Sequence, residues 1–89
     1  MPTQFTLAQN YPNPFNPATR VAFSLPTPTH VRLTVHDVLG RTVAVLADEP
    51  LSAGTHEATF EATGLPSGVY VYRLEAGGRT LTRTMLLMR

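Results

Sequence analysis

Hydrophobic and polar residues alternate along most of the chain, a period of two that is typical of β-strands with one buried face. The clearest runs are residues 19–25 and 30–37, in which every second side chain is aliphatic or aromatic. No segment repeats its hydrophobic positions with the period of a helix. The pattern predicts strands at residues 5–8, 19–25, 30–37, 42–46, 55–61, 65–74 and 80–88.

Turn residues separate these runs at intervals near the roughly 8–12 residues that are common in β-sandwich domains. Gly40 lies in the turn at residues 37–41, and a Gly-Gly pair at residues 77–78 suits a primed hairpin turn. Residues 47–53 contain Pro50 and predict a loop. We therefore expect an all-β fold, an immunoglobulin-like Greek-key β-sandwich of about seven strands, whose strand order the periodicity leaves open.

The strand that begins after Pro66 and Gly68 is rich in β-branched and aromatic residues, the composition of a buried strand. Its residues Tyr70, Tyr72 and Leu74 share one face. A tyrosine that starts a strand after such a turn also occurs in tyrosine corners, where its hydroxyl bonds to upstream backbone. Both a tyrosine corner and an ordinary core strand fit the sequence.

Three prolines and three asparagines stand within residues 10–17. Proline has no N–H and forces its predecessor into an extended conformation, so this stretch cannot be a central strand. We predict a rigid, ordered crossing loop whose two rings, Tyr11 and Phe15, anchor it to the core. A recognition surface is a second interpretation, compatible with the first, because a rigid loop loses little entropy on binding.

Composition narrows the class of protein. The chain has 89 residues, of which 43% are hydrophobic, and this suits one folded domain spanning residues 1–89. A net charge of +1 lacks the basic excess of nucleic-acid or anionic-membrane surfaces, and the absence of cysteine excludes disulfides and thiol chemistry. No apolar run approaches the roughly 20 residues of a membrane span. Residues 1–4 do not resemble a secretory signal, so we expect a domain excised from a larger protein.

Residues suited to catalysis or metal binding are few. His30, His36 and His56 stand in no spacing typical of such sites, and we expect His36 and His56 to be solvated strand residues. Asp48 and Glu49 offer ligands for a cation, but they supply few of the roughly six to eight oxygens that calcium takes, so a solvated loop pair is the simpler interpretation. We predict no catalytic residue, no cofactor and no metal.

Several motifs, taken in order along the chain, resemble those of the C-terminal sorting domains of the type IX secretion system. They are the Asn-Pro stretch at residues 10–17, Asp-Val-Leu-Gly-Arg at residues 37–41 and Leu-Pro-Ser-Gly-Val-Tyr at residues 65–70. A basic and aliphatic tail follows at residues 83–89, ending in Arg where members of the family often end in Lys. The motif residues are Tyr11, Pro12, Asn13, Pro14, Phe15, Asn16, Pro17, Asp37, Gly40, Arg41, Leu65, Gly68 and Tyr70.

The resemblance implies a non-enzymatic domain with an immunoglobulin-like fold, which the related domain of flagellar hook-capping proteins shares. Such domains stand at the C-terminus of large exported proteins of Bacteroidetes-like bacteria, often glycoside hydrolases or proteases. The implied partners are the N-terminal cargo domain of the same chain, the outer-membrane translocon of the type IX system, and a sortase-like peptidase that links some cargoes to surface lipopolysaccharide. The implied location is the cell surface or the medium, reached through the periplasm and the outer membrane.

The tail is the segment to which the resemblance assigns docking. Its apolar residues occupy both faces of the predicted strand, so the strand end is either buried on both sides or exposes an apolar patch beside two arginines. The expected docking residues are Arg83, Met85, Leu86, Leu87, Met88 and Arg89.

Two other classes of function remain open. A carbohydrate-binding module stacks sugar rings on exposed aromatic side chains, and a planar row of Tyr11, Tyr70 and Tyr72 would provide such a surface. A passive spacer would have neither a dedicated binding surface nor an exposed apolar tail. The sandwich fold by itself does not choose among these functions.

Overall fold

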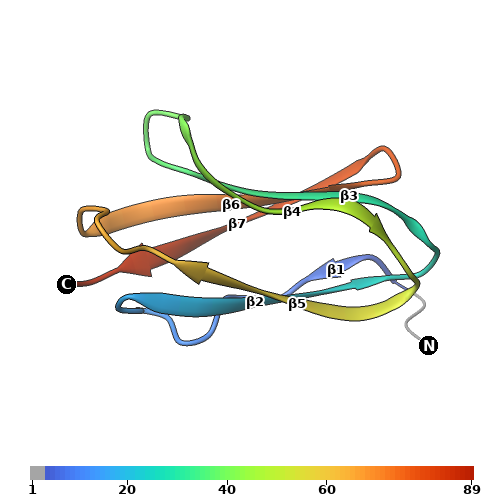
Figure 1. The fold of residues 1–89 in the computed structure, drawn as a ribbon, viewed down its shortest axis with the longest axis horizontal. Coiled ribbons are helices and arrows are strands. Elements are labelled where there is room, and N and C mark those ends of the chain that lie inside the picture. Colours follow the sequence, from blue (N-terminus) through green and yellow to red (C-terminus); the bar gives the residue numbers. More distant parts are fainter. Residues whose placement is uncertain (1–3) are drawn as a thin grey trace.

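The computed structural model describes residues 4–89, which form a sandwich of two antiparallel sheets (Figure 1). The strands are β1 (Thr6–Leu7), β2 (Ala18–Leu25), β3 (Thr29–His36), β4 (Thr42–Leu51), β5 (Gly54–Glu61), β6 (Gly68–Ala76) and β7 (Arg79–Leu87). The all-β sandwich that the alternation predicts is therefore confirmed. The expected lack of a secretory signal mainly concerns residues 1–3, which lie outside the described residues.

One sheet has the order β1-β2-β5 and the other has the order β4-β3-β6-β7. After the β3–β4 hairpin the chain crosses to place β5 beside β2, and it then returns to place β6 beside β3. This return is a Greek-key connection. The order could not be read from the period of the sequence, because the same alternation would suit any strand with one buried face.

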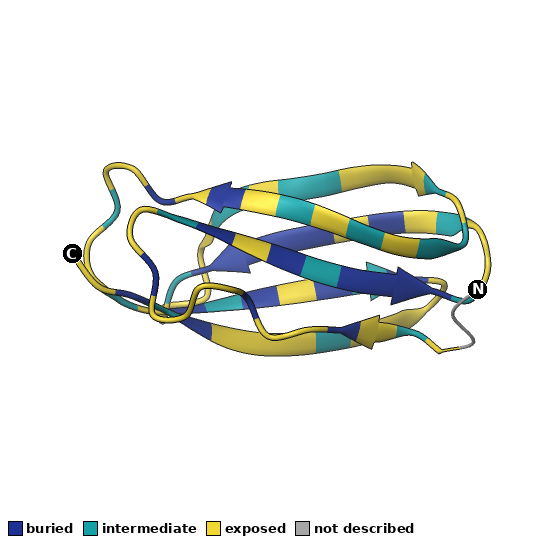
Figure 2. Cartoon of the chain, turned by 90° about the horizontal axis from the view of Figure 1, so that it is seen from below, coloured by how far each residue is buried: buried dark blue, intermediate teal, exposed yellow. Residues whose placement is uncertain are grey.

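The core lies between the two sheets and is built from alternate residues of the strands, as Figure 2 shows by the alternation of buried and exposed segments. Both central strands of the larger sheet, β3 and β6, contribute three or more fully or nearly fully buried side chains. The largest fully buried hydrophobic side chains are Tyr72, Leu25, Leu33, Leu74, Met85 and Leu87.

The predicted loop at residues 47–53 is wrong, because β4 continues through Pro50 to Leu51. β4 is an edge strand, so the missing N–H of Pro50 is tolerated where it does not interrupt a central ladder. Asp48 and Glu49 are therefore exposed strand residues and not a loop pair. The Asp48 carboxylate lies 2.6 Å from Nε2 of His30, on the neighbouring strand β3.

The two predicted glycine turns are confirmed. Gly40 has φ of +85°, and Gly77 and Gly78 have φ of +56° and +78°. Positive φ at both central residues is the requirement of a type I′ hairpin turn, which explains the Gly-Gly pair between β6 and β7. The tyrosine corner is also present, since the Tyr70 hydroxyl donates a hydrogen bond of 2.7 Å to the Pro66 carbonyl oxygen, four residues upstream.

The Asn-Pro stretch is ordered, as predicted, and is fixed to both sheets. Tyr11 exchanges backbone hydrogen bonds with Arg20 of β2, and Phe15 forms an isolated bridge with Leu87 of β7. The Phe15 ring is buried, with its centroid 5.9 Å from that of Phe60. The expectation that Tyr11 also anchors the stretch is wrong, because its side chain is 73% exposed. Its ladder position beside Arg20 leaves its ring outside the core.

The prediction that His36 and His56 are solvated is wrong for His36 and only partly right for His56. His36 is buried, and its two ring nitrogens lie within hydrogen-bond distance of the hydroxyl groups of Thr34 and Thr42. His56 is half-buried and stacks on Phe23 with a centroid separation of 5.6 Å. Threonine hydroxyls can both donate and accept, so they satisfy either ring tautomer of His36 and permit its burial.

The Tyr72 hydroxyl joins the start of the Asn-Pro stretch to the core. It donates a hydrogen bond of 2.7 Å to the Ala8 carbonyl oxygen and accepts one of 2.9 Å from the Asn10 backbone N–H. Burial raises the pKa of Tyr72 above its ordinary value, although the hydrogen bond from Asn10 and the charge of Arg83 act in the opposite direction. The hydroxyl therefore stays protonated and available as a donor.

We expect Tyr72→Phe to lower the free energy of unfolding by about 1–3 kcal/mol, because it leaves the buried N–H of Asn10 without its partner. Tyr70→Phe is the matched control. Its acceptor belongs to the exposed Pro66, so water can replace the lost bond and the expected loss is below about 1.5 kcal/mol. Urea unfolding of the two variants measures the difference, and equal losses would contradict this account.

Candidate docking surface

The motif-bearing turns, widely separated in sequence, lie at the same end of the sandwich as the chain's C-terminus (Figure 1). The Asn-Pro stretch reaches β7 through the bridge between Phe15 and Leu87. The guanidinium of Arg89 donates to the carbonyl oxygens of Leu65 and Ala62, which lie in the connection between β5 and β6. The turn at residues 37–41 faces that connection across a hollow. The sequence motifs at residues 10–17, 37–41, 65–70 and 83–89 thus form one surface, which we call the C-terminal end.

The turn at residues 37–41 is held by the carboxylate of Asp37. Its Oδ1 accepts hydrogen bonds from the backbone N–H groups of Leu39 (2.9 Å) and Arg41 (3.0 Å), and its Oδ2 accepts one of 2.8 Å from Arg41 Nε. Two backbone bonds, Asp37 N to Arg41 O and Gly40 N to Asp37 O, close the turn. The result is a rigid turn whose tip, Val38 and Leu39, is 74% exposed at both residues.

These hydrogen bonds give the Asp37 carboxyl a lowered pKa. Partial desolvation acts to raise the pKa, but the hydrogen bonds from Arg41 and Leu39 and the positive charge of Arg41 outweigh it. A group whose pKa is lower in the folded state stabilises the fold above its unfolded pKa, near 3.9, and loses that contribution as the pH falls through the folded value.

We therefore expect the stability of the chain to fall on acidification below about pH 4 in part through Asp37. Asp37→Asn should be less stable than the parent chain at neutral pH, and the difference should shrink as the pH falls through the lowered pKa. Urea unfolding of both proteins across this pH range measures it. A difference that is constant with pH would show that the carboxylate charge has no part in holding the turn.

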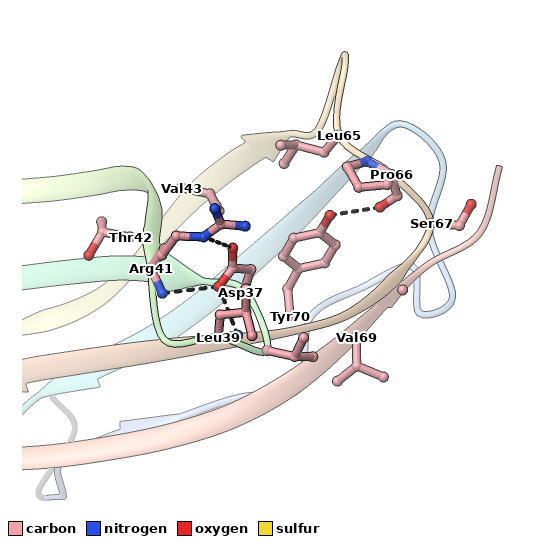
Figure 3. Close-up of a pocket in the computed structure, with 12 residues that line it drawn as sticks. Asp37, Leu39, Arg41, Thr42, Val43, Leu65, Pro66, Ser67, Val69 and Tyr70 are labelled. Carbon is pink, nitrogen blue, oxygen red and sulfur yellow. Dashed lines mark hydrogen bonds and ion pairs between the residues drawn. The ribbon is translucent and has the colours of Figure 1, made fainter.

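A hollow of about 410 Å³ separates this turn from the connection that leads into β6 (Figure 3). Its lining includes Leu65 and Tyr70 from the connection and β6, and the tip residues Val38 and Leu39 from the turn. Val69, at the start of β6, also lines it and is exposed. The tyrosine-corner bond fixes the Tyr70 ring, so the hollow has rigid walls on both sides.

The apolar residues of the tail divide between the core and the surface. Met85 and Leu87 are 1% and 0% exposed and belong to the core. Leu86 lies opposite Val69 in the β6–β7 ladder and is half-buried, while Met88 is 55% exposed. In the folded domain, therefore, only Leu86 and Met88 of the four present apolar surface to a partner.

The two tail arginines, Arg83 and Arg89, donate hydrogen bonds to segments outside β7. Arg83 Nε donates to the carbonyl oxygen of Leu7 in β1. Arg89 donates through its backbone N–H to Ser67 Oγ at 3.0 Å and through Nη2 to the Ala62 carbonyl oxygen at 2.8 Å. Their charge thus has a structural use within the domain, in addition to any use in docking.

The outer edge of β7 is covered at its end by the Asn-Pro stretch. Leu86 donates its N–H to Asn13 Oδ1 and accepts from the N–H of Phe15, both at 3.0 Å, and Met88 N–H donates to the Phe15 carbonyl oxygen at 3.1 Å. Further back, the Gln9 side chain donates to the Thr84 carbonyl oxygen at 2.7 Å. A partner strand cannot add to this end of β7 while the stretch is in place.

Residues of other candidate sites are not brought together. Among residues 4–89, no group of three or more His, Cys, Asp or Glu side chains is placed to hold a metal. Tyr70 and Tyr72 are buried, so the three tyrosines do not form the exposed row that sugar binding would use. No helix within residues 4–89 has the length and apolar composition that a membrane crossing requires.

Sequence reasoning missed the exposed pair Val38 and Leu39. The signal was present, because two adjacent apolar residues in a glycine-containing turn have no core to enter and must face solvent. It also missed that residues 37–41 and 65–70 meet, since this contact depends on the crossing of the two hairpins.

A comparison with models of protein families identifies the family. A family model described as "Secretion system C-terminal sorting domain" matches residues 9–88, which include the motifs of the C-terminal end apart from Arg89, the last residue of the tail. No curated protein and no solved structure matches the chain.

Proposed function

The chain belongs to the family of secretion system C-terminal sorting domains, and on that premise we propose that its C-terminal end is the surface on which the type IX translocon recognises the protein. Domains of this family are non-catalytic sorting signals of the type IX system, and they direct the proteins that carry them to the cell surface or the extracellular space. The observation that carries the proposal is the gathering of the family's motifs at one end of the fold.

We propose that the chain is the C-terminal domain of a longer secreted protein and that its cargo is an N-terminal domain such as a glycoside hydrolase or a protease. The outer-membrane translocon would bind the folded domain after the cargo reaches the periplasm. A sortase-like peptidase would then remove the domain and attach the cargo to the surface. The family match over residues 9–88 supports the proposal that the translocon acts first and the peptidase second.

We assign the tail residues two kinds of role within this function. Leu86 and Met88 are the tail residues proposed to contact the translocon, because Leu86 lies opposite the exposed Val69 and Met88 is itself exposed. Met85 and Leu87 are proposed to act through the fold, since they are buried. Arg83 and Arg89 keep β1 and the β5–β6 connection in place and thereby position the surface.

A spacer is the weaker alternative. It predicts no exposed apolar patch, whereas Val38, Leu39, Val69 and Met88 are exposed large hydrophobic residues at the C-terminal end. Large exposed apolar patches with polar borders are typical of interaction sites.

An export assay tests the proposal. A signal peptide and a fluorescent reporter are fused ahead of the 89-residue chain and expressed in a host with an intact type IX system and in its translocon-null strain. We expect reporter at the surface or in the medium only in the intact strain. Reporter held in the periplasm of both strains, with the domain folded, would overturn the proposal for that host.

A further inference from the structure

We propose that the hollow between the turn at residues 37–41 and the connection at residues 65–68 binds a peptide segment of a partner protein that carries a carboxylate beside an aliphatic side chain. The inference deepens the proposed function by naming the chemistry of the partner, and it rests on that function for the role of the C-terminal end as a docking surface. Three features of the hollow support it.

The first feature is the display of apolar side chains that the fold does not need. The turn is closed by Asp37 and by the positive φ of Gly40, so the residues between them could be polar without loss of a contact in the core. They are instead Val38 and Leu39, each 74% exposed. A rigid turn that holds apolar side chains in water is organised in advance for binding, because little conformational entropy remains to be lost.

The second feature is the guanidinium of Arg41, whose terminal N–H groups are available as hydrogen-bond donors. Arg41 Nε bonds to Asp37 Oδ2, and this fixes the direction of the side chain. Within residues 4–89, the two terminal Nη groups of Arg41 have no hydrogen-bond partner. Figure 3 shows the guanidinium on the side of its turn that faces Tyr70. A carboxylate is the group that matches such paired N–H donors best.

The charge of Arg41 is available for this purpose even though Asp37 is close. Both oxygens of Asp37 already accept hydrogen bonds from the turn, and its carboxylate is bonded to the guanidinium through Nε. Among the residues that line the hollow, the one acidic residue is Asp37, which is already paired with Arg41, so the lining within residues 4–89 holds no further carboxylate that would repel an incoming anion. An incoming anion therefore meets an oriented donor pair.

The third feature is the apolar lining and its size. Leu65, Val69 and Tyr70 add to the apolar lining that Val38 and Leu39 begin. A volume of about 410 Å³ lies at the lower end of the roughly 300–1,000 Å³ typical of ligand sites, which suits one or two side chains of an extended segment. Together with Arg41, this lining matches an aliphatic residue next to Asp or Glu.

A peptide titration followed by NMR tests the inference on the 89-residue chain. The probes are two acetylated and amidated pentapeptides, Gly-Leu-Asp-Leu-Gly and Gly-Leu-Asn-Leu-Gly, which differ only in whether the central side chain is a carboxylate or the neutral amide of similar shape. We expect the Asp peptide to shift the backbone amide signals of residues 38–41 and 65–70 saturably at millimolar concentrations. The Asn peptide should bind about tenfold more weakly, since a charge-assisted hydrogen bond is roughly twice as strong as a neutral one.

Two variants separate the charged from the apolar contribution. Arg41→Gln should remove the difference between the two peptides, because the backbone N–H of residue 41 still bonds to Asp37 and the turn persists. Leu39→Ser should weaken both peptides. Val45→Ser is the matched control, since Val45 is also an exposed apolar residue but does not line the hollow, and it should leave both affinities unchanged.

Each other outcome overturns the inference. Equal binding of the two peptides would leave an apolar groove with no role for a carboxylate. Absence of binding to either peptide would remove the site. Binding to vesicles of phosphatidylethanolamine and phosphatidylglycerol that is lost in Leu39→Ser, without peptide binding, would make the turn tip a membrane contact. The export assay is independent of the peptide titration. If the peptides do not bind but the reporter is still exported by the type IX system, this inference fails and the proposed function stands.

Discussion

Removal of residues 85–89 is expected to leave the chain largely unfolded at room temperature. The deletion removes Met85 and Leu87, which are fully or almost fully buried, and with them the hydrogen bonds of Met88 to Phe15 and of Arg89 to Ala62. Truncation of one buried Leu or Met to Ala costs about 2–5 kcal/mol. Two such losses are comparable to the total stability of a small domain, about 5–15 kcal/mol.

Circular dichroism and urea unfolding of the truncated chain measure this effect. Met88→Ser is the matched control within the tail, because it keeps the backbone bond to Phe15 and changes only an exposed side chain, so its effect should be within about 0.5 kcal/mol. A truncated chain with a cooperative transition close to that of the full chain would contradict the placement of Met85 and Leu87 in the core.

This expectation changes how a deletion of the tail is interpreted. If export fails when residues 85–89 are removed, the loss of a folded domain explains the failure as well as the loss of a docking signal does. Point variants at Leu86 and Met88 distinguish the two explanations, since neither side chain is fully buried. A variant such as Met88→Ser that unfolds normally but is not exported would locate part of the signal on the surface of the tail.

The strands themselves were predictable because burial on one face imposes a period of two on the sequence, whatever the partner of the strand. The failure at Pro50 has a different origin. Whether a proline is tolerated depends on whether its strand is at the edge of a sheet, and that is a property of the strand order and not of the local sequence. β4 also has two irregularities of register opposite β3, which a strict alternation does not reveal.

The individual turns of the candidate docking surface could be predicted from the sequence, but the way they come together could not. The turn at Gly40 and the tyrosine corner at Tyr70 follow from local turn chemistry. The exposure of Tyr11 and the burial of Phe15 could not be predicted in this way, because both are aromatic residues next to proline. Their positions are decided by different backbone pairings, Tyr11 with Arg20 of β2 and Phe15 with the distant Leu87 of β7.

Burial of His36 is a similar case. Its position on the polar face of β3 predicts exposure, but Thr42 of β4 and Thr34 supply hydroxyl partners for both ring nitrogens. A single sequence does not show which hydroxyl groups will lie beside a histidine on a neighbouring strand. The same limit applies to the hollow, whose two walls lie in different hairpins.

The sandwich has sheet edges that other chains could pair with, and the Asn-Pro stretch protects the edge nearest the C-terminus. Unpaired backbone groups on an exposed edge invite association with other strands. At β7 these groups are bonded to Asn13 and Phe15 over residues 86–88. The side chain of Phe15 packs in the core and thereby holds the stretch against the edge.

Phe15→Ala is therefore expected to lower the free energy of unfolding by about 3–5 kcal/mol, the usual loss for a buried phenylalanine. It should also free the end of β7, because the bonds between Phe15 and residues 86 and 88 depend on the position of the stretch. Urea unfolding measures the first effect, and faster hydrogen exchange at the amides of Leu86 and Met88 measures the second.

Tyr11→Ala provides the control for Phe15→Ala. It removes an aromatic ring of the same stretch, but that ring is exposed, so the expected change in the free energy of unfolding is within about 0.5 kcal/mol. Exchange at Leu86 and Met88 should then stay slow. Equal losses in the two variants would mean that the stretch is held by its prolines and backbone bonds alone, and that the burial of Phe15 does not protect the edge of β7.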